Sequence, residues 1–534
     1  MNEFVKPTIE YADLSPLLIV FGVACVGVLV EAFAPRRVRF VSQSVLAGAG
    51  LVAALVATIL VAIDLPVLKD ADGTVVARGL IGAMGSIAID GPAVFMWGLT
   101  LVFALFGTML FAERHLEGGV SAFAGQAAAL PGTEAERQAS TRGLEHTEVF
   151  PLLMFAVGGM MMFPASNDLI TMFVALEVLS LPLYLLTGLA RRRRLLSQEA
   201  ALKYFLLGAF SSGFFLYGLA LVYGYAGSMD FSAINEATRN DVSNQALLLA
   251  GMGLLSVGLL FKVGAAPFQS WTPDVYQGAP TPVTAFMAAG TKVAAFGALM
   301  RLFYVAFGAD RWSWQPMLWA VAILTMVVGA VLALSQTDVK RLLAYSAVAH
   351  TGFLLTGVIG LQSQSDLAVG QVTSLQAVLF YLATYGFATL GAFAVVTLVR
   401  DSGGEASALN RWAGLGKEAP LVAGVFAFFL LAMAGIPLTS GFIGKWAVFE
   451  VALSAGAWPV VVVALVTSIV AAFFYVRVIV LMYFSDPIGA GPTVTNPSVL
   501  TAATVAVCSA ATLVLGVVPG PLLDLAARAG EFVR

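Results

Sequence analysis

The chain alternates long apolar segments with short polar connections along nearly its whole length, and no other feature constrains its fold as strongly. A helix that crosses a bilayer needs about 20 mostly apolar residues, and about fourteen such segments are present. They lie near residues 16–34, 41–63, 92–112, 149–165, 168–190, 198–225, 246–276, 279–307, 314–335, 342–361, 374–399, 419–454, 457–484 and 496–518. The pattern predicts an all-α polytopic membrane protein, because a lipid-embedded backbone must satisfy its own polar groups.

Composition excludes a soluble protein of several domains, which length alone would suggest for 534 residues. Hydrophobic residues make up 59% of the chain and charged residues only 11%, whereas soluble domains carry about 25% charged residues. A net charge of −3 indicates no nucleic-acid partner. Cys25 and Cys508 are isolated in apolar segments and predict neither a disulfide framework nor a metal site. Residues 16–34 are predicted to be a retained helix, since no basic n-region and cleavage site precede them.

The distribution of charge among the loops predicts the orientation of the chain. One set of loops holds Arg36, Arg37, Arg39, Arg191 to Arg194, Lys340, Arg341, Arg400, Arg411 and Lys417. The alternate set holds mostly acids, namely Asp64, Asp70, Asp72, Asp230, Glu236, Asp241 and Asp366. Because Lys and Arg concentrate in cytoplasmic loops, the pattern predicts a multi-pass protein of a bacterial plasma membrane with both termini on the periplasmic side.

Matching stretches reveal an internal repeat. The pairs are YLLTGL at 184–189 with FLLTGV at 353–358, ALKYFLL at 201–207 with AVLFYLA at 377–383, GAAPF at 264–268 with AGIPL at 434–438, and VAAF at 293–296 with VAAF at 470–473. Helices 4–8 therefore correspond to helices 9–13. Since five crossings is an odd number, the two units must be inverted, as in many transporters.

The repeat predicts four regions of the chain. They are an N-terminal three-helix segment at 1–148 with long loops, a first five-helix repeat at 149–307, a second at 314–484, and a C-terminal helix and tail at 485–534. The long connection at 64–91 is expected to form a small hairpin, and the one at 113–148 reads as an insertion or a mobile loop.

The seventh and twelfth segments are too long for one straight crossing, and we predict that both are broken. Pro267 interrupts one and Pro437 the other. Proline has no backbone N–H to donate, and its ring clashes with the carbonyl one helical turn earlier. The freed polar groups are tolerated in a membrane only against protein or a wet cavity. The breaks should therefore give Lys262 and Lys445 access to water and to helix ends.

Ionisable residues occur inside the apolar segments, although a charge at a helix centre costs about 2.5–3.5 kcal/mol even on a mild scale. They are Glu177, Lys203, Lys262, Lys292, His350 and Lys445. Arg301 and Arg477 lie near segment ends and are expected to reach the polar surface. Lysine suits proton transfer because burial lowers the pKa of a lysine, and a nearby carboxylate opposes that shift. The row therefore predicts a proton relay, with Lys262 as the natural partner of Glu177. The alternative is that the charges only pair and hold helices together.

The charges do not follow the repeat. Glu177 corresponds to Ser346 of the second unit, and Lys292 corresponds to Ile469. The two units thus share a scaffold without sharing its charged residues, which favours a functional origin for the charges.

Three stretches together resemble a known family. They are WTPDVYQGAPTPVTAF at 271–286, TDVKRLLAYSAVAHTGF at 337–353, and the FxGKW pattern at 442–446. They are similar to subunit N of respiratory complex I, the proton-pumping NADH:quinone oxidoreductase, and the resemblance extends from about residue 10 to 520. Subunits L and M and the Mrp-type antiporters share the fold but do not usually share PDVYxGAPTPVTAF.

The resemblance implies a proton-translocating subunit and a role for each matching residue. Glu177 and Lys262 would form an ion pair between helices five and seven, Lys292 would be the central lysine of helix eight, and Lys445 would be the terminal site in helix twelve. Lys203 and His350 would occupy further positions on the polar axis. The chain departs from the family at Gln269, where histidine is common. Glutamine cannot carry a proton, which puts an essential proton carrier at this position in doubt.

The resemblance also implies partners. The sequence has no GxGxxG motif after a strand, no cysteine cluster and no haem-ligand pattern, so NADH, flavin, iron–sulfur clusters and quinone are expected in partner subunits. The implied partners are the other membrane subunits, among them subunit M and the small membrane subunits, together with lipids. Two alternatives remain open: an Mrp-like cation/proton antiporter driven by an ion gradient, and a structural scaffold.

Overall fold

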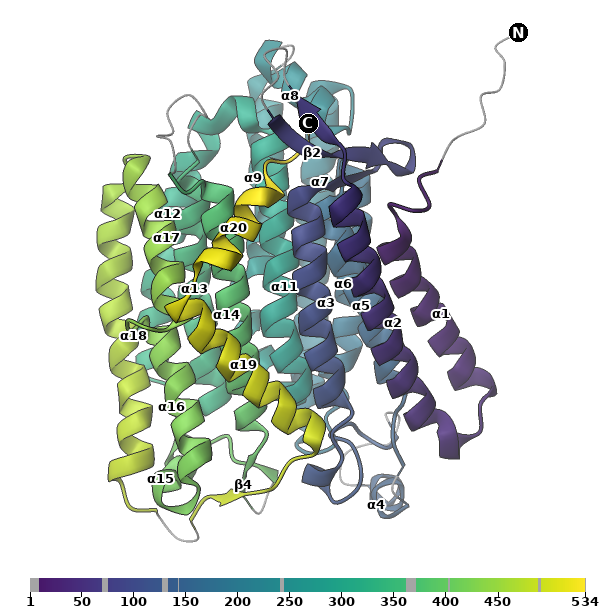
Figure 1. Cartoon of the computed structure of the whole chain (residues 1–534), viewed down its shortest axis with the longest axis vertical. Coiled ribbons are helices and arrows are strands. Elements are labelled where there is room, and N and C mark those ends of the chain that lie inside the picture. The colour runs from purple at the N-terminus through teal and green to yellow at the C-terminus, as the bar shows by residue number, and fades with distance from the viewer. Residues whose placement is uncertain are drawn as a thin grey trace.

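A computed structural model describes most of the chain, as a bundle of long helices that run roughly along one axis (Figure 1). The described residues are 9–69, 75–126, 133–142, 144–240, 244–361, 371–401, 404–487 and 491–533, without the side chains of 75, 76, 136 and 139–141. Asp70, Asp72, Asp241 and Asp366 lie outside them.

Every predicted apolar segment forms helix. Single helices are α1 (Ser15–Phe33), α2 (Arg36–Asp64), α3 (Gly91–Phe111), α5 (Val149–Ala165), α6 (Leu169–Thr187), α7 (Arg194–Ala226), α11 (Thr281–Arg301), α12 (Arg311–Leu334), α13 (Val339–Ile359), α14 (Ser374–Val396), α18 (Trp458–Phe484) and α19 (Val499–Val517). The two segments with an internal proline are broken, into α9 (Gln245–Val263) with α10 (Trp271–Gly278) and α16 (Pro420–Ala434) with α17 (Ser440–Ser454). In the described part of the chain, 12 helices are long and apolar enough to cross a membrane, and α5 and α16 are shorter apolar helices. The all-α membrane fold is confirmed.

Small elements complete the connections. Short α-helices are α4 (Glu134–Thr141), α8 (Phe231–Asn240), α15 (Leu415–Glu418) and α20 (Gly520–Ala529), and a π-helical turn, η3 (Leu302–Ala306), follows α11. The 3-10 turns are η1 (Ala83–Gly85), η2 (His115–Glu117), η4 (Gly308–Asp310) and η6 (Leu409–Trp412). The strands are β1 (Val67–Lys69), β2 (Val75–Gly82), β3 (Ile87–Asp90), β4 (Val399–Asp401), β5 (Gly404–Glu405) and β6 (Thr493–Val494). They form two antiparallel sheets, in the orders β1-β2-β3 and β5-β4-β6, and the first contains the predicted hairpin.

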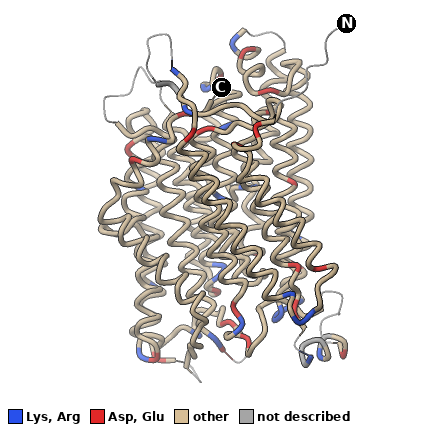
Figure 2. Tube along the Cα trace, turned by 45° about the vertical axis from the view of Figure 1, so that its right-hand side comes forward, with Lys and Arg blue, Asp and Glu red and all other residues tan. Residues whose placement is uncertain are grey.

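Charged residues gather at the two ends of the bundle and are sparse between them (Figure 2). At one end, which we call the basic end, the predicted basic loops meet: Arg193 Nη2 donates to the Glu405 carbonyl at 3.2 Å, and Arg400 pairs with Glu117. At the other, the hairpin end, Glu10 accepts a hydrogen bond from the Ala83 amide at 3.1 Å. The described parts of both chain termini lie at this hairpin end, since the last described residue, Val533, is also bound there.

The two repeats have the same internal contacts. In the first unit α5 packs on α6, and α7 packs on both halves of the broken helix, α9 and α10. In the second unit α12 packs on α13, and α14 packs on both α16 and α17. The first unit begins at the basic end and the second at the hairpin end, which makes them inverted (Figure 1). The residue boundaries of the four regions stay a prediction.

Helix α11 is the centre of the bundle, because all of its residues are buried. It packs on α3 and α5 from the first half of the chain and on α14 from the second. Close packing depends on small residues: a Cβ at Gly297 would lie 2.3 Å from the sulfur of Met96. Polar side chains on α11 are therefore kept from lipid on every side.

Part of the 113–148 connection, predicted as an insertion or a mobile loop, packs against the bundle. Phe123 is fully buried, and the amide of Ala124 donates to the Leu189 carbonyl at 2.8 Å. Arg191 Nε donates to the Ser121 carbonyl, also at 2.8 Å. These bonds fix residues 121–124 against the connection between α6 and α7.

Candidate functional site

The break after α9 exposes one backbone carbonyl inside the bundle. Helix α9 ends because Gly264 adopts a left-handed conformation, φ +75°, which L-residues disfavour. The amide of Ala265 turns back to the Leu260 carbonyl at 2.9 Å, so the carbonyl of Val263 is left without a helical partner. Lys262 occupies the last turn, directly before this carbonyl.

The break after α16 repeats this geometry. Gly435 is left-handed, φ +85°, and the amide of Ile436 donates to the Leu431 carbonyl at 3.1 Å. The carbonyl of Ala434 is thereby presented to the interior, where Lys445 Nζ donates to it at 2.8 Å. Each broken helix thus offers an equivalent carbonyl to a lysine, Val263 to Lys292 and Ala434 to Lys445. The predicted access of Lys262 and Lys445 to water stays a prediction.

Lys262 is buried among neutral acceptors. Its Nζ donates to the Ser180 hydroxyl at 2.7 Å and to the Tyr204 hydroxyl at 3.3 Å, and it lies 5.4 Å from the centre of the Tyr204 ring. The predicted direct ion pair with Glu177 is absent from the ion pairs of the described residues. Glu177 lies one turn before Ser180 on α6, so the serine hydroxyl meets the ammonium group first.

Glu177 nevertheless belongs to this part of the site. Its Oε1 is buried and has no hydrogen-bond partner among the described residues. A buried carboxylate oxygen without a hydrogen-bond partner is costly, so Glu177 would be stabilised by a new polar contact at this atom.

Lys292 is held at the junction of the two repeats. It is 3% exposed, and its Nζ donates to the carbonyl of Val263 at 3.1 Å and to the carbonyl of Ala347 at 3.0 Å. It also donates to the hydroxyl of Thr351. The Val263 carbonyl that Lys292 binds follows Lys262 directly in the sequence, and Ala347 and Thr351 place α13 of the second repeat around Lys292.

His350 continues the row on α13, between Ala347 and Thr351 in sequence. Its Nδ1 lies 2.7 Å from the Tyr381 hydroxyl and its Nε2 lies 3.3 Å from the Tyr475 hydroxyl. Both tyrosines are buried, and Tyr475 also hydrogen-bonds Ser346. A histidine between two hydroxyls has a proton donor or acceptor on each side of its ring.

Lys445 ends the buried row. Besides the Ala434 carbonyl, its Nζ binds the Ser468 hydroxyl at 2.8 Å and lies 4.9 Å from the centre of the Phe353 ring. The ring of Phe353 in turn packs edge-on against His350. The structure therefore brings Lys262, Lys292, His350 and Lys445 together into one buried polar row that crosses both repeats, and the half-buried Glu177 lies on α6 one turn from Ser180.

Lys203 does not belong to this row, contrary to the expectation from the sequence. Its side chain is 45% exposed and pairs with Glu199 at 2.7 Å and Asp274 at 3.0 Å. Asp274 also pairs with Arg341 at 2.5 Å. Lys203 lies on the outer face of α7, where it ties α7 to α10, while its neighbour Tyr204 points inward to Lys262.

Arg301 was expected to reach the surface but is fully buried. Its Nη2 pairs with Asp90 at 2.6 Å, and both side chains are 0% exposed. Asp90 also accepts hydrogen bonds from the amides of Ala93 and Val533, each at 3.0 Å. The pair joins the end of α11 to the start of α3 and to the C-terminal residues. Apolar residues on both sides of Arg301 were the available signal, but its distant partner could not be found from spacing.

Arg477 behaves as expected. It is exposed, and its guanidinium donates to the Leu334 carbonyl at 2.7 Å and the Gln336 carbonyl at 2.6 Å at the end of α12. Gln269 lies in the break between α9 and α10, and its Oε1 is buried without a hydrogen-bond partner among the described residues.

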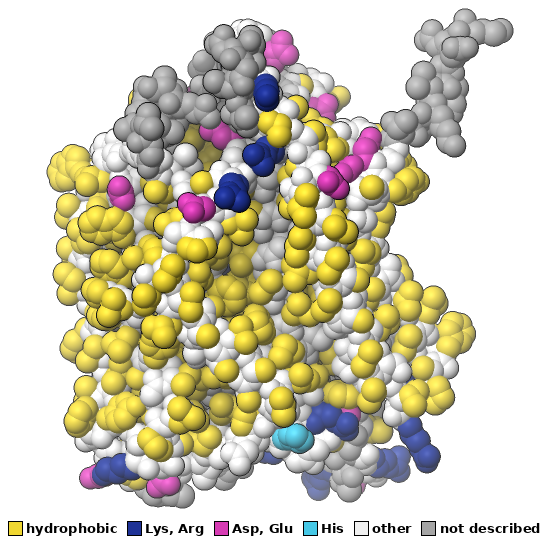
Figure 3. Space-filling model, viewed as in Figure 1, with side chains coloured by type: hydrophobic (Ala, Val, Ile, Leu, Met, Phe, Trp, Pro, Cys, Tyr) yellow, Lys and Arg dark blue, Asp and Glu magenta, His cyan; other side chains and the backbone are white. Residues whose placement is uncertain are grey.

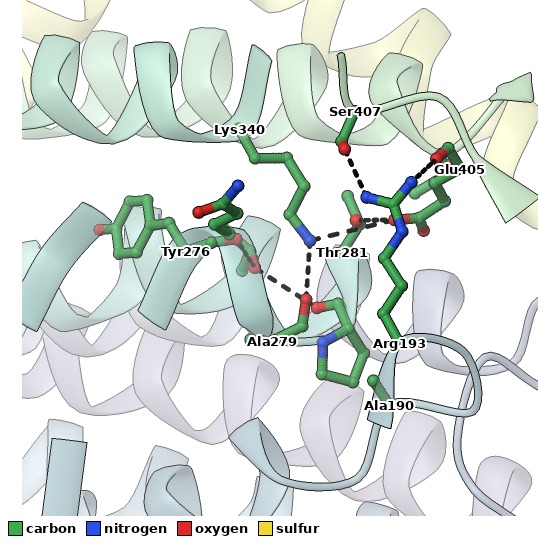
Figure 4. Close-up of polar contacts among 12 residues, drawn as sticks. Ala190, Arg193, Tyr276, Ala279, Thr281, Lys340, Glu405 and Ser407 are labelled. Carbon is green, nitrogen blue, oxygen red and sulfur yellow. Dashed lines mark hydrogen bonds and ion pairs between the residues drawn. The ribbon is translucent and has the colours of Figure 1, made fainter. Parts of the chain in front are cut away.

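A second polar cluster, near the basic end, was missed from the sequence. Lys340 is buried, donates to the Ala279 carbonyl at 2.7 Å, and lies 3.9 Å from Glu405. Glu405 also hydrogen-bonds Thr281, at the start of α11, while Arg193 binds Ser407 (Figure 4). A cavity of about 50 Å³ adjoins these residues. The sequence analysis had treated Lys340 only as a loop cation that sets orientation.

This cluster and the buried row both include residues of α13. Lys340 and Ala347 are seven residues apart, two turns of helix, and so lie on the same face. That face carries the carbonyl that binds Lys292. Helix α13 thus contributes to both the cluster at the basic end and the buried row.

Comparison with known proteins shows what the chain is similar to. Residues 166–471 match the family described as NADH:quinone oxidoreductase/Mrp antiporter, TM. NADH-quinone oxidoreductase subunit N of Nocardioides sp. is 74% identical over 536 residues, with 100% of both chains covered. A chain of respiratory complex I from Thermus thermophilus is 34% identical with a TM-score of 0.74, over 97% of this chain and 100% of that one. A chain of the Mrp complex from Dietzia sp. has a TM-score of 0.77 at 21% identity, over 98% and 97%, which shows the shared fold alone.

Proposed function

Because the chain belongs to the subunit N family of NADH-quinone oxidoreductase, the respiratory complex I, we propose that it moves protons across the membrane through its buried polar row. The carriers are Lys262, Lys292, His350 and Lys445, and Glu177 controls the first of them. One observation supports this most directly: three buried lysines are each held by neutral oxygens, with no carboxylate within ion-pairing distance among the described residues.

Neutral acceptors suit a group that must hold and release a proton. A buried lysine that is salt-bridged stays charged, whereas one held by hydroxyl and carbonyl oxygens is easier to deprotonate. Ser180, Thr351 and Ser468 each supply a hydroxyl to one lysine. A hydroxyl can both accept from the ammonium form and donate to the neutral amine.

Coupling between the lysines is electrostatic. Charge on Glu177 favours the protonated form of Lys262. If that carboxylate is moved or neutralised, Lys262 releases its proton, and the electrostatic repulsion that its positive charge exerts on Lys292 falls. Lys292 then holds a proton more readily. His350 and its tyrosines carry the change on to Lys445.

Protons enter, in this proposal, through the cluster at Lys340 and Glu405. The cavity there has a volume of about 50 Å³. It has room for water, because one buried water molecule needs a cavity of about 10–15 Å³. By the distribution of Lys and Arg, the basic end faces the cytoplasm and both termini lie on the periplasmic side. Protons are thus taken up from the cytoplasm of a bacterium.

Energy comes from redox chemistry in the partner subunits, where we place NADH, flavin, iron–sulfur clusters and quinone. Contacts with the other membrane subunits, including subunit M and the small subunits, would act on Glu177. An Mrp-like antiporter is disfavoured because full-length similarity at high identity is to subunit N proteins, whereas the Mrp likeness is one of fold.

The test is Lys262→Met in the purified complex, with assembly verified on a native gel. Methionine keeps the apolar stem and removes the charge. We expect quinone-linked NADH oxidation and proton uptake into liposomes to fall together. The matched control is Lys417→Met, since Lys417 is an exposed lysine paired with an exposed aspartate. An assembled Lys262→Met complex that pumps like the parent would show that the lysine only holds helices together.

A further inference from the structure

An apolar groove on the outer face of the bundle has an unusual charged rim. The groove has a volume of about 990 Å³ and is walled by α2, α3, α14, α19 and α20. Its lining contains two charged side chains, Arg78 and Arg528, and no carboxylate. Figure 3 views this face, where hydrophobic side chains cover the helices and charged side chains of both signs lie toward the upper and lower ends.

The two arginines have nothing to bind in the described part of the chain. Both are exposed, and neither guanidinium forms an ion pair or a hydrogen bond there. Arg78 comes from β2 and Arg528 from the last turn of α20, so separate elements bring them to one rim. Two unpaired arginines above an apolar groove attract an anion that carries an apolar tail.

The length of the groove identifies the kind of occupant. Along α3 it extends from Gly91 to Val102, which is about 16 Å at the rise of an α-helix. That is about half of a hydrocarbon core of about 30 Å, or the depth of one leaflet. A transmembrane helix of another subunit would need a groove through both leaflets. The depth therefore fits acyl chains better than a helix.

We propose that this groove binds an anionic phospholipid of the leaflet at the hairpin end. The acyl chains lie along α3 and α19, and the phosphate lies between Arg78 and Arg528. Because α20 forms part of the wall, the lipid also joins the C-terminal helix to α2 and α3. This leaflet is the one whose loops carry few basic residues, so two free arginines at one groove are a specific feature and not part of a general basic surface.

Photo-crosslinking of the purified complex in nanodiscs tests the proposal. The probes are phosphatidylglycerol and phosphatidylcholine, each with a diazirine in one acyl chain, and labelled peptides are mapped by mass spectrometry. We expect phosphatidylglycerol to label α3 and α19 within the groove. Replacing Arg78 or Arg528 by glutamine should reduce this labelling about fivefold for each arginine. The control is Arg239→Gln, an exposed arginine of α8 at the same end, outside the groove.

A second variant blocks the groove without touching its charge. A Cβ at Gly98 meets nothing within 4 Å, so Gly98→Phe should be accommodated and should fill the groove. Gly224→Phe, on the exposed face of α7, is the matched control with equally open surroundings. We expect labelling of α3 and α19 to be lost in the first variant and kept in the second.

Two results would overturn the proposal. Equal labelling by both probes, unchanged by the arginine substitutions, would mean that the groove holds only ordinary boundary lipid. Labelling of the isolated full-length chain but not of the assembled complex would mean that a partner subunit covers the groove.

Discussion

Helices α11 and α18 hold the same place in the two repeats but have different surroundings. Lys292 on α11 is buried, whereas the corresponding Ile469 on α18 is 72% exposed. Helix α11 lies between the repeats and is enclosed by both, while α18 lies at the edge of the chain (Figure 1). The same position of the repeat is therefore buried in the first unit and exposed in the second. Only the buried one is a lysine.

The broken helices differ in a related way. Both present a carbonyl after the last helical turn, but the first carbonyl binds a lysine from α11 and the second binds a lysine from α17. The first site is therefore completed across the repeat boundary, by Ala347 and Thr351 of α13. The second site is completed within its own repeat. Proton transfer between repeats, on this view, depends on Lys292.

The largest effect should come from the arginines near the ends of α11 and α18. Arg301→Gln leaves Asp90 buried without its partner, which costs about 3–5 kcal/mol. Arg477→Gln loses exposed hydrogen bonds to two carbonyls, at about 0.5–1.5 kcal/mol each. Thermal unfolding of the purified complex measures both. Equal losses of stability in the two variants would show that the buried Arg301–Asp90 pair contributes no more to stability than the exposed hydrogen bonds of Arg477.

Next in size is the effect of removing the lysine itself. Lys292→Met should lower proton pumping about a hundredfold, the lower end of what a positioned proton-transfer group contributes. Ile469→Met, at the corresponding position of the second repeat, should leave pumping unchanged. The measurement is proton uptake in liposomes at matched amounts of assembled complex. If both variants pump normally, the contrast between α11 and α18 has no functional meaning.

The helix breaks allow a comparison of smaller size. Alanine in place of Gly264 or Gly435 must adopt a left-handed conformation, which costs about 1–2 kcal/mol. Both variants should therefore unfold at lower temperature. A Cβ at Gly435 would also lie 3.0 Å from Cδ of Lys445, whereas one at Gly264 would meet the hydroxyl of Thr272 at 2.9 Å.

Pumping should consequently fall more for Gly435→Ala than for Gly264→Ala, although their stabilities change alike. The opposite order would indicate that the position of Lys445 is not limiting.

The smallest effect should come from the serines beside the lysines. Ser180→Ala and Ser468→Ala each remove one hydrogen bond, a loss of about 1 kcal/mol. The effect on pumping should be larger for Ser180→Ala, because the remaining partner of Lys262 is at 3.3 Å and that of Lys445 is at 2.8 Å. Initial rates of proton uptake would rank the two. A larger effect of Ser468→Ala would contradict this order and would mean that pumping depends more on the hydrogen bonds of Lys445 than on those of Lys262.

The sequence by itself determined the elements and their order. Apolar length predicted every long helix, since a lipid-exposed helix must be apolar regardless of its neighbours. Proline and the length of the two segments predicted the two breaks, because the backbone restriction of proline is local. The matching stretches predicted the inverted repeat, and the motifs at 271–286 and 337–353 predicted the family.

Only the tertiary structure decided which charges meet. Lys203 and Tyr204 are adjacent in sequence, yet one faces outward and the other binds Lys262. Arg301 finds Asp90 across 211 residues, and Lys262 binds Ser180 in place of the expected Glu177. Hydropathy reports that a residue lies within a membrane segment but not which side of the helix faces protein. That side is set by packing between distant helices, and it distinguishes the buried polar row from an exposed ion pair such as that of Lys203.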